Sequence, residues 1–187
     1  LDPAGREAPR NLTEGVGRAN DIRFGYVNLE GGGGGRFGGG ASEGIDPRDP
    51  ALLSAFQIYT KASGYYRDQF SLTREPQQLL MGDYSYGSLQ KAEDADVVVM
   101  TRQSFEEFPD LWLTDTDFAD MEKITDANPQ QEEYTWGSAE IVEWVSNDGI
   151  PLQGILIKPE GFDPAQKYPM MVYFYERSSD GLHRYRT

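Results

Sequence analysis

Short apolar runs separated by turn residues fill the first two-thirds of the chain. These runs are rich in Val, Ile, Tyr, Phe and Trp, and helical periodicity is scarce. A pattern of this kind is typical of β-strands. The predicted strands cover 22–29, 56–61, 64–70, 96–101, 110–114 and 121–125, with turns at 62–64, 107–109 and 115–117. The chain up to residue 128 is therefore predicted to be all-β.

A faint internal repeat accompanies these strands. Segments 10–13, 76–80 and 123–125 each look like a short outer strand that closes a unit, roughly 45 to 65 residues apart. That spacing is in the range of a four-stranded propeller blade with loop insertions. Chance resemblance among short β segments is the alternative interpretation.

Glycines at 31–35 and 38–40 flank Arg36 and Phe37. A phosphate-binding loop would need a Lys-Ser or Lys-Thr after the glycines, at the start of a helix. No such pair follows, and ordering so many glycines costs much backbone entropy. We interpret 31–40 as a flexible insertion between strands and not as a ligand site.

The pattern changes after residue 128. Two strand-like runs, 139–145 and 152–157, are joined by 146–149, whose Asp148-Gly149 pair suits a tight reversal because glycine accepts positive φ. A loop from 158 to 167 leads to 170–175, which is apolar at every position. Such a run is expected of a strand buried on both faces of an α/β sheet. We therefore expect a second domain to begin in 129–187.

Composition excludes several kinds of partner and chemistry. The 187 residues include 31 acidic and 17 basic side chains, for a formal net charge of -14. This balance disfavours binding modes in which Lys and Arg neutralise phosphates, so neither nucleic acid nor a membrane surface is an expected partner. The absence of Cys excludes disulfides, zinc–thiolate sites and thiol nucleophiles.

The two ends are interpreted as cuts from a longer protein. The chain starts at Leu1-Asp2-Pro3 without Met or a signal-peptide pattern, and it stops at Arg186-Thr187 soon after a strand-like run. The compartment is left open on this interpretation, whether periplasmic, secreted or cytoplasmic.

His183 is the only imidazole, with Ser178, Ser179 and Asp180 beside it. A Ser-His-Asp triad usually draws its members from separate parts of a rigid fold, and no Gly-x-Ser-x-Gly segment is present. A polar loop is therefore the preferred interpretation of 178–183.

Carboxylates occur close together at 106–107, 115–117 and 132–133. Such pairs can bind metal or clamp an amine, but in so acidic a chain we interpret them as solvated loops. No metal site and no cofactor are predicted.

Segments 139–144, 148–156, 158–164 and 167–175, taken in order, resemble one junction in a known family. They are similar to the passage from the propeller into the catalytic domain in prolyl-oligopeptidase-family serine peptidases, on the dipeptidyl peptidase IV and acylaminoacyl peptidase side. Segment 101–112 also looks like the final-blade pattern of that family.

This resemblance implies a mainly β fold, with the last blades of a β-propeller followed by the first strands of an α/β-hydrolase domain. Residues 1–128 would be the C-terminal part of the propeller, and 129–187 the linker and the start of the peptidase domain. The implied function is hydrolysis of peptide bonds in short peptides by a serine-type peptidase. Its Ser-Asp-His triad would lie outside this chain, which is therefore expected to be inactive. The full-length protein could form a homo-oligomer.

In that family the Tyr that ends this strand helps to stabilise the oxyanion, and it falls on Tyr175. Related sequences continue with small residues and Pro, whereas this chain has Glu176-Arg177-Ser178-Ser179. The alternative for Tyr175 is an aromatic residue at a strand end. The alternative for the whole protein is a non-catalytic β-propeller binding or interaction protein with a degenerate hydrolase domain.

Overall fold

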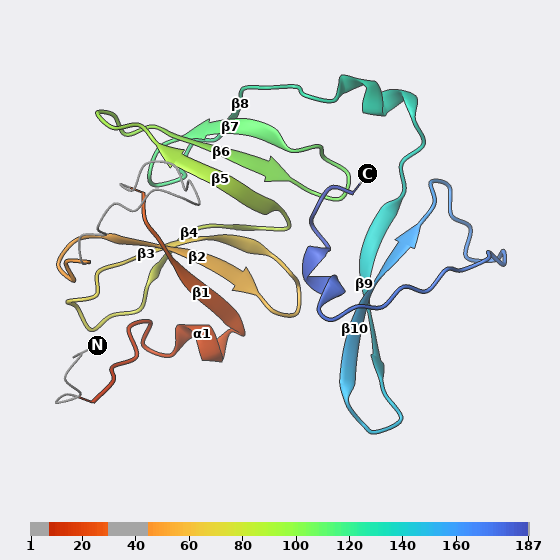
Figure 1. Ribbon diagram of the computed structural model, residues 1–187, viewed down its shortest axis with the longest axis horizontal. Coiled ribbons are helices and arrows are strands. Elements are labelled where there is room, and N and C mark those ends of the chain that lie inside the picture. Colours follow the sequence, from red (N-terminus) through yellow and green to blue (C-terminus); the bar gives the residue numbers. More distant parts are fainter. Residues whose placement is uncertain (1–7, 30–44, 187) are drawn as a thin grey trace.

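Two four-stranded antiparallel sheets and one separate hairpin make up the fold (Figure 1). The computed structural model describes residues 8–29 and 45–186. The first sheet contains β1 Ile22–Val27, β2 Ala51–Gln57, β3 Ser63–Asp68 and β4 Gln77–Gly82, and the second contains β5 Ser85–Lys91, β6 Val98–Gln103, β7 Asp110–Thr114 and β8 Glu122–Lys123. The hairpin consists of β9 Ser138–Val145 and β10 Pro151–Lys158. The helical elements are α1 Val16–Ala19, η1 Pro129–Glu133 and η2 Ser178–Gly181.

Each four-stranded sheet is a simple meander in which consecutive strands pair. This order follows from short connections, since antiparallel neighbours need only a tight turn between them. Residues 30–44, which include the predicted glycine insertion 31–40, lie outside the described residues. No helix among the described residues is long and apolar enough to cross a membrane.

A shared apolar core joins the two sheets. Its buried members are Leu52 and Tyr65 from the first sheet, Met100 from the second, and Phe118 from the loop after β7. The Tyr65 and Phe118 rings stack with their centroids 4.8 Å apart. Burying four large apolar side chains removes much hydrocarbon surface from water, at about 25 cal/mol per Å². The sheets therefore hold each other in place.

The opposite face of the first sheet has a second apolar cluster. Leu53, Ala55 and Tyr66 are buried there, with Phe24 packed edge-on to Tyr66 at a centroid distance of 5.1 Å. Neighbouring residues on a strand point to opposite faces, so Leu52 packs in the core between the sheets and Leu53 packs in the second cluster. The first sheet therefore carries apolar clusters on both of its faces.

Several strand predictions are confirmed. The hairpin at 139–157 forms with Val145 opposite Pro151, and Gly149 in its turn has a φ of 79°. The strand at 110–114 also matches β7. By contrast, segment 10–13, which was expected to be an outer strand, forms turns ahead of α1. Turn residues and β-favouring composition therefore predicted a strand correctly only where that strand pairs with the next one in sequence.

The predicted fold class is wrong. The described strands form three small antiparallel sheets, and they close into neither a barrel nor a propeller. An α/β-hydrolase start requires strands that alternate with helices, and the described part of 129–187 contains a hairpin and two short 3-10 helices instead. The Asp148-Gly149 turn and the runs on either side of it specify a hairpin. They do not specify whether that hairpin belongs to a larger parallel sheet.

The buried strand predicted at 170–175 is also wrong. Met171 is 95% exposed and Phe174 is 88% exposed, and no strand is assigned in this part of the chain. Apolar composition predicted burial, but no described element provides a neighbouring strand for this run. The segment 169–175 is an extended, solvent-exposed connection between β10 and η2.

Two methionines test this description of the core. Met100 is completely buried, so we expect Met100→Ala to lower the free energy of unfolding by about 2–5 kcal/mol. Met170 is 74% exposed, and Met170→Ala is expected to leave stability nearly unchanged. Urea unfolding followed by circular dichroism measures both variants. A large loss in the Met170 variant would contradict the exposed placement of 169–175.

Candidate functional site

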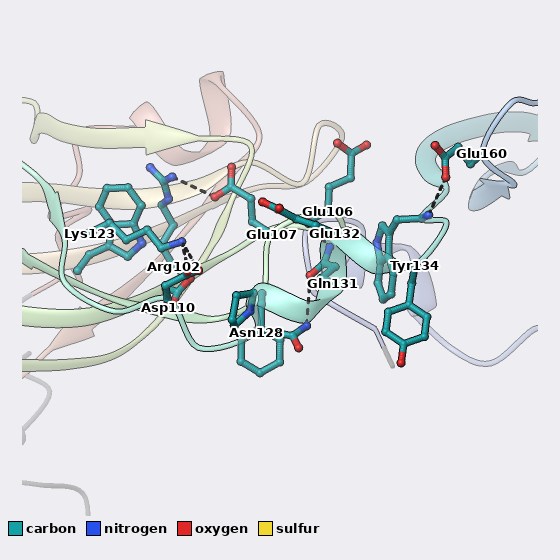
Figure 2. Close-up of a pocket in the computed structure, with 15 residues that line it drawn as sticks. Arg102, Glu106, Glu107, Asp110, Lys123, Asn128, Gln131, Glu132, Tyr134 and Glu160 are labelled. Atoms are coloured by element: carbon teal, nitrogen blue, oxygen red, sulfur yellow. Dashed lines mark hydrogen bonds and ion pairs between the residues drawn. The ribbon is translucent and has the colours of Figure 1, made fainter.

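A groove of about 550 Å³ lies between the second sheet and the segment that leads to the hairpin (Figure 2). We call it the acidic groove. Its walls come from β6, the β6–β7 turn, β7, β8, the connection through η1, and the start of the loop after β10. The residues that line it are Arg102, Glu106, Glu107, Phe108, Asp110, Trp112, Lys123, Asp126, Asn128, Pro129, Gln131, Glu132, Tyr134, Trp136 and Glu160.

Arg102 is held between two aromatic rings at one side of the groove. Its guanidinium carbon lies 3.6 Å from the Trp112 ring centroid and 4.1 Å from that of Tyr84. Its Nη2 donates to Glu107 Oε2 over 3.0 Å. Stacking on aromatic faces stabilises a guanidinium, and the carboxylate neutralises its charge. Arg102 therefore shapes the wall of the groove and is not a free cation.

Asp110 anchors the connecting segment from the buried side. Its Oδ1 accepts hydrogen bonds from Thr125 Oγ1 at 2.6 Å and from the Ala127 amide at 2.9 Å. The Lys123 ammonium lies 2.8 Å from its Oδ2. Burial alone would raise the pKa of Asp110, but the hydrogen bonds from Lys123, Thr125 and Ala127 outweigh that effect and lower the pKa below its ordinary value. The side chain is therefore a structural carboxylate.

The far wall is fixed by contacts from η1 and Trp136. Gln131 Nε2 donates to the Glu106 carbonyl oxygen over 2.7 Å. The Trp136 indole nitrogen donates to the Phe105 carbonyl oxygen over 2.9 Å, and the Trp136 amide donates to Glu160 over 3.2 Å. These bonds connect the β6–β7 turn, η1 and the loop after β10, three parts of the chain that are far apart in sequence.

The groove carries an excess of negative charge. Six carboxylates line it, against two cations. Both cations are already paired, Arg102 with Glu107, and Lys123 with Asp110 and Asp126. Among the described residues, the carboxylates of Glu106 and Glu132 have no ion-pair partner, and both are exposed at the groove. The arrangement is suited to an amine or a guanidinium group next to aromatic surface.

A second hollow, of about 530 Å³, continues from the acidic groove toward the hairpin. Glu106, Gln131, Trp136 and Glu160 line both hollows. The two hollows therefore adjoin each other on one surface. Within the described residues, no group of three or more His, Asp or Glu side chains is placed to hold a metal ion.

Tyr175 is the site residue expected from the sequence, and it lines neither hollow. Its side chain is 66% exposed, and its carbonyl oxygen accepts hydrogen bonds from the amide and hydroxyl of Ser178. Its assignment as an oxyanion donor stays a prediction.

The Ser, Asp and His side chains near the end of the chain face different partners. Asp180 accepts a hydrogen bond from Arg23 over 2.9 Å and pairs with the buried Lys61 at 3.3 Å. His183 Nε2 lies 3.1 Å from the Thr60 carbonyl oxygen and 3.7 Å from Asp83 Oδ1. These contacts attach segment 178–186 to the first sheet and do not align a nucleophile with a base.

The residues of the acidic groove were missed by sequence reasoning. The acidic pairs at 106–107 and 132–133 were interpreted as solvated loops, yet one member of the second pair and both members of the first line the groove. The available signal was the aromatic residues near each pair, Phe108 and Trp112 beside the first and Tyr134 and Trp136 beside the second. Aromatic residues that accompany exposed carboxylates are typical of a binding surface.

Comparison with known proteins gives a fold likeness only. No family model matches the chain, and no curated protein matches it. Among solved structures, a variant of AtxE2 isopeptidase with Astexin3-dC4 bound has a TM-score of 0.53 at 14% identity, over 67% of this chain and 19% of that one. AtxE2 isopeptidase in its apo form has a TM-score of 0.50 at 16% identity, with the same coverage. The chain therefore resembles about a fifth of each neighbour.

These results correct the family resemblance suggested by 139–175. Two solved structures that the chain resembles are of AtxE2 isopeptidase. A mostly β structure with almost no helix does not match a propeller joined to an α/β-hydrolase. The short motifs of that junction describe a hairpin and a turn-rich loop, and such elements occur in many folds.

Asp110 provides a test of how the groove is held. Its pKa is lowered by folding, so its contribution to stability is present above the unfolded value near 3.8 and is lost as pH falls through the folded value. At pH 7 we expect Asp110→Asn to lower the free energy of unfolding by about 1–3 kcal/mol, as loss of hydrogen bonds to a charged group does.

Urea unfolding of the wild type and this variant between pH 7 and pH 3 measures the effect. The difference between them should shrink as pH falls below about 4. Asp126→Asn is the matched control, since Asp126 shares Lys123 but is 72% exposed, and no measurable change is expected. If the difference in unfolding free energy between the wild type and Asp110→Asn is as large at pH 3 as at pH 7, the charge of Asp110 is not the source of its stabilising effect.

Proposed function

We propose that this chain is the peptide-binding β part of a peptide-cleaving hydrolase, and that the acidic groove receives the peptide. The observation that carries this proposal is the combination of unpaired carboxylates, Glu106 and Glu132, with the exposed aromatic face of Tyr134 in one hollow of about 550 Å³. Short peptides offer both groups that such a surface can bind, a cationic amine or side chain and an apolar side chain.

The fold likeness supports the same proposal. Both solved neighbours are described as isopeptidases, and one has Astexin3-dC4 bound. An isopeptidase must hold a peptide while a bond in it is broken. A β segment that resembles part of such an enzyme is well suited to the holding step.

We further propose that the catalytic step is of the serine type and is performed by residues outside this chain. A triad requires an imidazole, and His183 is the only one in the sequence. Its ring nitrogen contacts a carbonyl oxygen at 3.1 Å, with no serine hydroxyl among its described hydrogen-bond partners. The chain by itself is therefore expected to bind peptides without cleaving them.

Binding is tested by isothermal titration calorimetry with short peptides that carry a free amino terminus and an aromatic residue. We expect Glu106→Gln and Glu132→Gln together to weaken binding by roughly three- to tenfold, because two exposed charges are removed. The loss should diminish as salt is raised. Glu133→Gln is the matched control, since Glu133 is exposed on η1 but does not line the groove.

Equal affinities for the double variant and the control would exclude the acidic groove as the peptide site. Cleavage of the peptides by the chain alone, followed by mass spectrometry, would contradict the placement of the catalytic residues outside it. A protein that binds peptides but never cleaves them, even with its remaining residues present, would be the non-catalytic alternative.

Tyr175 enters this proposal as a candidate oxyanion donor. Its phenol is exposed, which leaves it available to a reacting group brought by residues outside this chain. In a protein that contains the catalytic residues, Tyr175→Phe is expected to lower kcat by roughly 10²- to 10³-fold with little change in KM. Tyr173→Phe, at a neighbouring tyrosine that is also exposed, is the control. An unchanged kcat in the Tyr175 variant would remove it from the mechanism.

A further inference from the structure

A tyrosine near the end of the described chain, Tyr185, packs against residues that line the acidic groove. The Tyr185 ring stacks on the Trp136 indole, with centroids 5.0 Å apart and planes 10° from parallel. It meets the Phe108 ring edge-on at 5.1 Å and 72°. Both partners also line the groove. Stacked and edge-to-face pairs at these distances are the favourable arrangements for aromatic rings.

Polar groups complete the surroundings of Tyr185. Asn128 Nδ2 donates to the phenol oxygen over 3.2 Å, and the Tyr185 amide donates to Gln103 Oε1 over 3.0 Å. Asn128 lines the groove as well. An aromatic side chain, its hydroxyl and its backbone amide are thus each recognised, as they would be in a bound peptide.

The charge of the resident segment is opposite to that of the groove. Arg184 and Arg186, on either side of Tyr185, are exposed, whereas the groove has six carboxylates and two cations that are already paired. This opposition favours a basic sequence around the aromatic residue. The rest of the segment is attached elsewhere, by Asp180 to Lys61 on the first sheet.

We infer that Phe108, Asn128 and Trp136 form a subsite for an aromatic residue flanked by basic residues, and that Tyr185 occupies this subsite as an intramolecular competitor. The inference rests on the proposed peptide-binding function of the groove, and it specifies the class of peptide and how access is limited. A peptide from solution must displace Tyr185, so its apparent affinity is reduced by the fraction of molecules in which the subsite is free.

The test compares three peptides by isothermal titration calorimetry: acetyl-Gly-Arg-Tyr-Arg-amide, the same peptide with Ala for Tyr, and the same peptide with Glu for both Arg. The blocked ends remove the terminal amine as a source of affinity. With the wild-type chain we expect weak binding of the Arg-Tyr-Arg peptide and weaker binding of the other two.

In Tyr185→Ala the subsite is empty, and we expect the Arg-Tyr-Arg peptide to bind roughly tenfold more tightly than to the wild type. Tyr185→Phe keeps the stacking and should behave like the wild type. Tyr173→Ala, at a tyrosine that is 80% exposed, is the control for loss of an aromatic side chain elsewhere. The Trp136 indole N–H signal, assigned with Trp136→Phe, should shift when the peptide binds.

The outcomes separate the inference from the function it rests on. Equal affinities of the wild type and Tyr185→Ala for the Arg-Tyr-Arg peptide would overturn the competitor, while peptide binding in the groove would stand. If Tyr185→Ala raises the affinity for the Ala peptide as much as for the Arg-Tyr-Arg peptide, the subsite does not select an aromatic residue, and that part of the inference is overturned. If no peptide binds either protein, including those with free amino termini, the proposed function fails together with the inference. Should Tyr185→Ala not fold, the peptide preference of the wild type still decides whether the subsite exists.

Discussion

The apolar core between the two sheets is the constraint on which the rest of the structure depends. A small antiparallel sheet is marginal in water by itself, and here each sheet buries one face against the other through Leu52, Tyr65 and Met100. Met100 and Arg102 point to the same face of β6, because they are two residues apart on a strand. The same strand face therefore begins in the core and ends in the wall of the acidic groove, and packing in the first region sets the geometry of the second.

The ion pairs in the acidic groove determine which of its charges stay exposed. The two cations at the groove are used internally, Arg102 to support an aromatic stack and Lys123 to hold Asp110. The carboxylates that remain unpaired give the open surface its sign. In the proposed peptide site, the paired cations stabilise one wall and the unpaired carboxylates make the rim negative. Charge at the rim and shape against the aromatic rings would then select the ligand.

The sequence predicted those parts of the fold that are specified locally. The Asp148-Gly149 turn and the apolar alternation around it were sufficient for the hairpin, and 110–114 matched β7. The strand 85–91 was missed because its residues are mostly polar or small, and 51–57 was assigned too late because its apolar residues begin before the predicted run. The groove depends on contacts between residues far apart in sequence, such as the hydrogen bond from Gln131 to Glu106. Local sequence patterns do not predict such contacts.

The exposed run 169–175 has a consequence for how the chain behaves in concentrated solution. Residues 170–175 are six successive apolar residues, four of which are Val, Tyr or Phe with strong β preference, and none carries a carboxylate or an ammonium group. Such a segment can stack between molecules into cross-β assemblies. The net charge of -14 on the whole chain opposes such contact by mutual repulsion. Contact between molecules through this run should therefore increase where that repulsion is weakened, in strong salt or in mild acid.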